Sequence, residues 1–182
     1  MNYVMKKLLL LFALVVAVAL NVNAQDDDDW DNEISLSYGI GAFTDVSSSY
    51  ISGVNFGKQT HYIGPFGLEY IRRPSERFGV GLLTTVGTCK WSESESSRAT
   101  YIGIMPAVKY NWYNRERFSM YSKAAIGVII GVSSGNEKNS TQAAFGWQAT
   151  PIGAEYGTMV RGFVELGFGE QGFLAAGLRV KF

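Results

Sequence analysis

Few residues in this sequence are suited to acid–base or nucleophilic chemistry. His61 is the only histidine and Cys89 the only cysteine, and three serines follow one another at 47–49. A histidine beside a serine would form a base–nucleophile pair, but a solitary histidine at the edge of a polar loop is more typical of a surface residue. Cys89 has no histidine or second cysteine near it in sequence, which favours an inert buried thiol. We therefore expect no catalytic residue and no enzyme.

Metal, cofactor and nucleic-acid sites are also not indicated. The acidic run at 26–29 could supply oxygen ligands to calcium, but runs of one charge are usually solvated and flexible. The many glycines match no phosphate-binding loop that leads into a helix. We expect no metal and no cofactor. The balance of 16 basic and 16 acidic residues argues against a nucleic-acid partner.

The first 24 residues have the pattern of a secretory signal peptide. Lys6 and Lys7 precede an unbroken apolar run of 13 residues at 8–20, and Val22-Asn23-Ala24 resembles a cleavage site. The apolar run is shorter than the ~20 residues of a spanning helix. We predict a signal peptide over 1–24, an acidic flexible segment over 25–32 and one domain over 33–182. With its single cysteine, this domain has no internal disulfide available.

The 33–182 segment reads as an all-β domain. Apolar and polar residues alternate with a period of two, no stretch sustains a helical period, and 21 glycines punctuate the chain. Prolines inside three of the runs predict local bulges at Pro65, Pro106 and Pro151. We predict eight strands over 33–43, 60–72, 78–91, 99–113, 118–133, 143–156, 160–168 and 172–182.

The connections alternate in length. Those at 73–76, 114–117 and 157–159 are tight, whereas 44–59, 92–98 and 134–142 are longer and polar. The connection near Glu170 is a short member of the second set. Such alternation is typical of an up-and-down transmembrane barrel, with its short turns facing the periplasm and its long loops facing outside. We therefore predict an eight-stranded antiparallel transmembrane β-barrel.

The two faces of the predicted strands differ sharply. One face is apolar, and the other is small or charged, with its charges in the strand interiors. A barrel of about eight strands has room inside for side chains and little else, so these charges should pair and fill the interior. The predicted inward network consists of Glu69, Lys109, Lys123, Glu155, Arg161, Glu165, Arg179 and Lys181. On this assignment, Gly167→Ser on the inward face should be tolerated.

Aromatic residues on the apolar face gather at the strand ends beside the tight turns. A soluble core has no reason to sort aromatics by height, whereas a membrane barrel places them at the lipid interface. Tyr62 and Phe168 would begin a second girdle at the opposite level. The predicted interfacial girdle consists of Tyr70, Phe78, Trp112, Phe118, Tyr156 and Phe182. The apolar face is therefore expected to contact outer-membrane lipid.

The segment end "VNAQ", the alternating strands and the closing "GFGEQGFLAAGLRVKF" resemble a family of small outer-membrane β-barrels of Bacteroidetes-type bacteria, related in architecture to OmpA/OmpX-type barrels. The resemblance spans the chain from about Glu33 onward. It implies that Phe182 and the last strand are the signal read by the barrel-assembly machinery. It also implies a location in the outer membrane.

Several functions are compatible with such a barrel. The first is a structural or surface-interaction protein whose loops 44–59, 92–98 and 134–142 contact a host surface, polysaccharide or other envelope proteins. The second is a narrow pore, which would need a water path past the eight inward charges. A lipid-modifying barrel enzyme and a soluble lipocalin-like carrier are weaker alternatives, because no catalytic constellation, Gly-x-Trp motif or apolar lumen is found. We favour the first.

Overall fold

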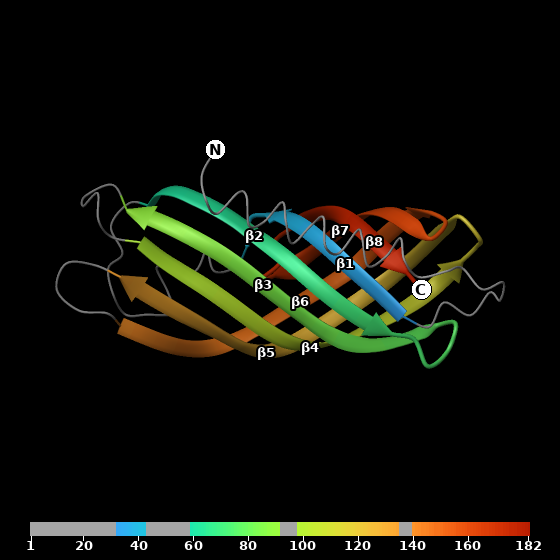
Figure 1. The fold of residues 1–182 in the computed structure, drawn as a ribbon, viewed down its shortest axis with the longest axis horizontal. Coiled ribbons are helices and arrows are strands. Elements are labelled where there is room, and N and C mark those ends of the chain that lie inside the picture. Colours follow the sequence, from blue (N-terminus) through green and yellow to red (C-terminus); the bar gives the residue numbers. More distant parts are fainter. Residues whose placement is uncertain (1–31, 43–58, 92–97, 135–139) are drawn as a thin grey trace.

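The chain closes into an antiparallel barrel in which every strand pairs with its sequence neighbours and β8 returns to β1. The computed structural model describes residues 32–42, 59–91, 98–134 and 140–182. The strands are β1 (Asn32–Ile40), β2 (Gln59–Arg72), β3 (Phe78–Trp91), β4 (Arg98–Asn114), β5 (Phe118–Ser134), β6 (Ser140–Gly157), β7 (Val160–Gly169) and β8 (Leu174–Lys181) (Figure 1). The predicted all-β fold class is confirmed.

The observed strand bounds lie within one residue of the predicted ones except at three ends, one of which is the start of β6 at Ser140 instead of 143. β1 stops at Ile40 instead of 43, because Gly41 has a φ of 71°, in the left-handed region. β8 begins at Leu174 instead of 172, because Gly172 has a φ of 99° and belongs to the turn after β7. The tight connections lie together at one end of the barrel (Figure 1). The predicted signal peptide over 1–24 lies outside the described residues, and so does the predicted flexible segment 25–32 except for Asn32, which is instead the first residue of β1.

Bulges at two of the three prolines shift the inward parity of their strands. The β2–β3 register shifts between Ile63 and Phe66, around Pro65. The β6–β7 register shifts between Ala149 and Ile152, around Pro151. These two bulges were predicted from the prolines.

The third predicted bulge is wrong. Pro106 pairs in register with Leu82, and the β3–β4 ladder has no shift. The shift on β4 instead lies between Asn111 and Tyr113, so Trp112 and Tyr113 are both exposed. A proline is compatible with a regular ladder where its missing N–H is not required, so sequence alone could not separate the three cases.

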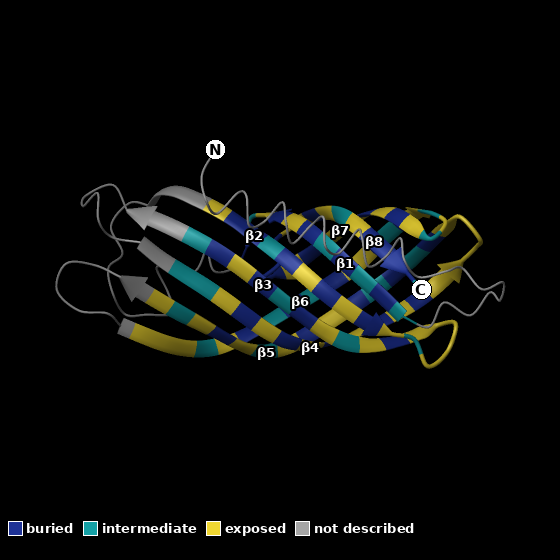
Figure 2. Ribbon diagram, viewed as in Figure 1, coloured by how far each residue is buried: buried dark blue, intermediate teal, exposed yellow. Residues whose placement is uncertain are grey.

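Burial alternates along the strands, with buried and exposed residues in turn (Figure 2). In β7, Val164 and Leu166 are about half exposed on the outer face, whereas Arg161 and Glu165 are buried. The exposed outer wall is apolar over its described extent, and the buried inner face carries most of the charge. This arrangement is the reverse of a soluble globule.

Candidate functional site

The barrel interior holds a cluster of ion pairs in which Arg179 is the central cation. Arg179 is fully buried. Its guanidinium hydrogen-bonds to Glu155 and, at 2.9 Å, to Glu69. It also lies over the rings of Tyr121 and Phe163, with 4.9 and 4.6 Å between its Cζ and the ring centroids. The planar fork of an arginine suits this bridging of two carboxylates.

Two groups of ion pairs meet at Arg179. In the group nearer the middle of the barrel, Lys123 Nζ lies 2.8 Å from a carboxylate oxygen of Glu69 and 2.8 Å from one of Glu165. The Tyr121 hydroxyl donates to Glu165 at 2.7 Å. Lys123 also donates to Gln171 Oε1 at 3.0 Å. This group joins β2, β5 and β7 to the turn before β8.

The second group surrounds Glu155, nearer the tight turns. Lys181 Nζ lies 2.5 Å from Glu155, and Lys109 Nζ lies 3.2 Å from it. Arg161 approaches Glu155 at 3.3 Å and donates to Ser119 Oγ at 2.8 Å. Side chains from β4, β6, β7 and β8 therefore meet at one carboxylate. Each partner compensates part of the cost of burying the others.

All eight residues predicted to face inward are buried, and each makes at least one of these ion pairs. Glu33, which was not part of the predicted network, is also buried. Its carboxylate lies 2.7 Å from Lys109 Nζ, 3.3 Å from Lys181 Nζ and 3.3 Å from Arg73 Nε. With Glu33, the five predicted cations face four carboxylates instead of three.

A signal for Glu33 was present in the alternation. Glu33 shares its face with Ser35 and Ser37, while Ile34 and Leu36 point outward. The predicted strand 33–43 begins at Glu33, but the predicted inward network did not include this residue. Its position inside the strand, on the same face as Ser35 and Ser37, indicates an inward side chain.

One part of the interior is apolar, which the sequence analysis did not predict. A buried cluster lies on the inner wall of β2 to β5 and consists of Ile71, Leu83, Met105, Ala107 and Ala125. The charged groups therefore occupy part of the cross-section and packed apolar side chains the rest. Apolar side chains of this kind fill space at high packing density and have no polar groups that need hydrogen-bond partners.

The predicted girdle aromatics lie on the outer face. Tyr70, Phe78, Trp112, Phe118 and Tyr156 are exposed, and Phe182 is half-buried. Tyr70 donates to Asn32 Oδ1 at 2.8 Å. Their role at a lipid interface remains a prediction.

The side chains of His61, Tyr62 and Cys89 lie outside the described part of the structure, although their backbones belong to β2 and β3. Phe168, the other residue predicted for a second girdle, is exposed and packs edge-to-face on Phe173, with 5.4 Å between ring centroids. Among the described residues, no three histidine, cysteine, aspartate or glutamate side chains gather as a metal site would need.

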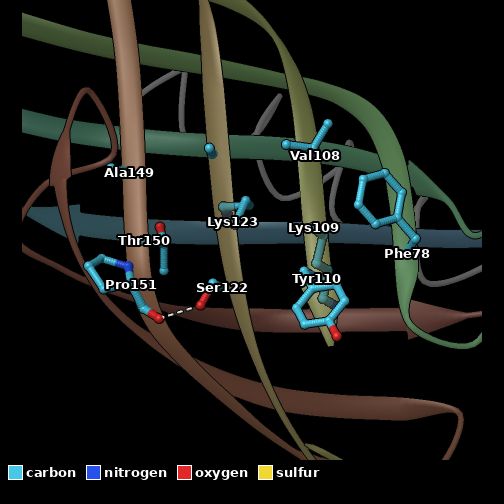
Figure 3. Close-up of a pocket in the computed structure, with 10 residues that line it drawn as sticks. Phe78, Val108, Lys109, Tyr110, Ser122, Lys123, Ala149, Thr150 and Pro151 are labelled. Atoms are coloured by element: carbon cyan, nitrogen blue, oxygen red, sulfur yellow. Dashed lines mark hydrogen bonds between the residues drawn. The ribbon is translucent and has the colours of Figure 1, made fainter. Parts of the chain in front are cut away.

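A shallow hollow of about 270 Å³ opens on the outer wall, where the small residues Ser122, Ala124 and Ala149 line it between β4 and β6. Phe78 and Tyr110 stand at its end towards the tight turns (Figure 3). Ser122 Oγ donates to the Pro151 carbonyl oxygen at 2.6 Å, which satisfies the hydroxyl locally. Lys109 and Lys123 also line the hollow, although their ammonium groups are held in the interior ion pairs.

Within the described ranges, no helix is long and apolar enough to cross a membrane. No protein-family model matches the sequence, and the comparison with curated proteins found no match. Solved structures with a similar fold include the N-terminal β-barrel domain of Pseudomonas aeruginosa OprF, at 12% identity, with 84% of this chain and 96% of that chain covered and a TM-score of 0.46. Another is Ail, the attachment invasion locus protein of Yersinia pestis, at 11% identity, with 82% and 92% covered and a TM-score of 0.43.

The geometry defines the class of this protein as a closed, eight-stranded, antiparallel up-and-down β-barrel with a filled, ion-paired interior.

Proposed function

We propose that the chain is an integral outer-membrane β-barrel that acts as a structural or surface-interaction protein through its long loops. The observation that carries the membrane assignment is the inverted polarity of the barrel. Its outer wall exposes large apolar side chains on every strand, whereas the charged side chains of the interior network are buried. Contiguous apolar surface on this scale does not persist in water.

The length and closure of the strands support the same proposal. A tilted strand needs about 9–11 residues to cross a bilayer, and β2 to β6 have 14 to 18 residues. Closure pairs β1 with β8, so no strand edge is left to face hydrocarbon. The Bacteroidetes-type family assignment and the signal peptide belong to this proposal as predictions from the sequence.

The filled interior supports a role at the loops over a role as a pore. Arg179, Lys109 and Tyr121 are fully buried in the cross-section and are held by ion pairs or hydrogen bonds. A solute would have to displace them. The segments 44–59, 92–98 and 134–142 are then the parts of the sequence available to contact a host surface or polysaccharide.

Envelope fractionation tests the membrane assignment. We expect recovery in the outer-membrane fraction and a change of gel mobility on boiling, because a closed barrel resists detergent until it is heated. Recovery in a soluble fraction, without heat-dependent mobility, would contradict the proposal.

Replacing each of the three loop segments by a short Gly-Ser linker tests the surface role. The variants should keep the heat-dependent mobility of the barrel and lose adhesion to polysaccharide or host cells. Unchanged adhesion in all three would point away from the loops.

A further inference from the structure

The tight-turn end of the barrel carries a group of exposed arginines that the ion-paired interior does not use. Two lie at the ends of the turn between β2 and β3, and two lie in the turn between β4 and β5. We call them the turn arginines; they are Arg72, Arg77, Arg115 and Arg117, and all four are exposed. No lysine is present in these turns.

These four guanidinium groups differ from the interior cations in their surroundings. In the part of the chain that the structure describes, no carboxylate lies within ion-pair distance of them, although Glu76 and Glu116 belong to the same two turns. Their neighbour Arg73 differs, since it lies 3.3 Å from Glu33 and belongs to the interior group. Among the described residues, the turn arginines therefore present positive charge without an ion-pair partner at one end of the barrel.

The surroundings of this charge identify its partner. Trp112, Tyr113 and Phe118 are exposed next to the turn arginines, and Arg115 lies over the Tyr113 ring, with 5.9 Å between its Cζ and the ring centroid. The apolar outer wall continues directly from these aromatics. A cation that stands above aromatic rings and an apolar wall lies at the height of phospholipid headgroups.

We propose that the turn arginines bind the phosphate groups of anionic phospholipids in the adjoining leaflet and so enrich these lipids around the tight-turn end. Arginine pairs with phosphate through two parallel N–H···O bonds, which lysine does not provide. Each basic residue near an anionic membrane surface strengthens the binding constant for that surface by about five-fold. The inference rests on the proposed membrane location, and it further specifies the class of lipid that is bound and the end of the barrel that binds it.

Fluorescence quenching by brominated lipids tests the proposal with a reporter at each end of the barrel. Trp112 reports the tight-turn end and Trp147 the long-loop side, where its carbonyl oxygen accepts a hydrogen bond from the Glu170 N–H. One variant keeps Trp112 as the sole tryptophan and carries Trp30→Phe, Trp91→Phe and Trp147→Phe. The other keeps Trp147 as the sole tryptophan and carries Trp30→Phe, Trp91→Phe and Trp112→Phe. Both are folded into phosphatidylcholine vesicles that contain a minority of phosphatidylglycerol, with either lipid brominated.

We expect brominated phosphatidylglycerol to quench Trp112 several-fold more than its mole fraction predicts, and to quench Trp147 in proportion to its mole fraction. The excess should shrink in high salt, because exposed charges are screened. The excess quenching should be lost in a quadruple variant that carries Arg72→Gln, Arg77→Gln, Arg115→Gln and Arg117→Gln. The matched control, Glu76→Gln/Glu116→Gln, should retain it.

Equal preference at both reporters, or an excess that survives loss of the turn arginines, would overturn the inference. In either case, quenching of both tryptophans by brominated phosphatidylcholine would leave the membrane assignment intact. Absence of quenching by either lipid at both positions would instead contradict the membrane assignment itself.

Discussion

Arg179 shows how a single residue organises the interior of this barrel. Its guanidinium lies within 3.6 Å of oxygen atoms on four glutamates that come from four different strands. Buried ion pairs give little net stability compared with a well-packed apolar core, but removal of one partner leaves uncompensated charge. Arg179 is therefore better described as fixing one interior arrangement than as the source of stability.

Replacing Arg179 by methionine should lower the free energy of unfolding by about 3–5 kcal/mol, because Glu69 and Glu155 lose a shared partner inside the barrel. Urea unfolding of the protein folded in detergent measures the change. Adding Glu69→Gln to Arg179→Met should recover part of the loss, since it removes one of the stranded charges. A larger loss in the double variant would show that the residues act independently.

Leu166→Arg should destabilise the barrel in a bilayer by about 2–4 kcal/mol, because Leu166 is about half exposed on the middle of the outer wall. Gly162→Ala is the matched control on the same strand, since an added Cβ there meets nothing within 4 Å. Unfolding in vesicles measures both variants. A neutral Leu166→Arg would show that this face does not contact lipid.

The expectation that Gly167→Ser is tolerated is wrong. A Cβ at Gly167 would lie 2.6 Å from the Ala149 carbonyl oxygen and 2.7 Å from Gln148 Nε2. Backbone of the neighbouring strand cannot move aside without breaking the ladder. The inward face is polar, but at this point it is also closed to side chains.

At the scale of the strand, β8 closes the barrel against β1. The Phe182 N–H donates to the Asn32 carbonyl oxygen at 2.9 Å, and the Asn32 N–H donates to the Phe182 carbonyl oxygen at 3.0 Å. Deletion of Phe182 would therefore remove two backbone hydrogen bonds along with the aromatic ring. A substitution of the Phe182 side chain keeps these two hydrogen bonds, so it tests the assembly signal without opening the β1–β8 contact.

Phe182→Ala should refold into detergent at near-normal yield, because loss of one half-buried ring removes at most about 1.5–3 kcal/mol of apolar burial. Its level in the outer membrane of living cells should fall sharply if the terminal aromatic is the assembly signal. Comparing refolding yield with membrane level provides the measurement, and Phe173→Ala, an exposed aromatic in the β7–β8 turn, is the control. Equal damage in both assays would make Phe182 a packing residue.

At the scale of the molecule, the filled interior predicts poor conduction. Ion pairs and the apolar cluster of Ile71, Leu83 and Met105 together occupy the cross-section. Protein reconstituted in a planar bilayer should carry little steady current. Large, stable, ion-selective channels would favour the narrow-pore alternative over a role at the loops.

Much of this architecture was predictable from the sequence, because the alternation of residues within one strand shows which side chains share a face. Alternation with a period of two distinguishes Arg161 and Glu165 from Val164 and Leu166 without knowledge of any partner. The turn residues set the number of strands and their bounds, as at 78–91, where the predicted and observed strands coincide. The eight predicted charges were located inside for the same reason.

Tertiary structure alone decided which of these charges meet. Glu155 contacts Lys109, Arg161, Arg179 and Lys181 because barrel closure and two bulges set the register between distant strands. The inclusion of Glu33, the regular ladder at Pro106 and the closed space beside Gly167 follow from the same register. A local pattern gives the direction of a side chain, whereas its neighbour across the barrel depends on how all eight strands close.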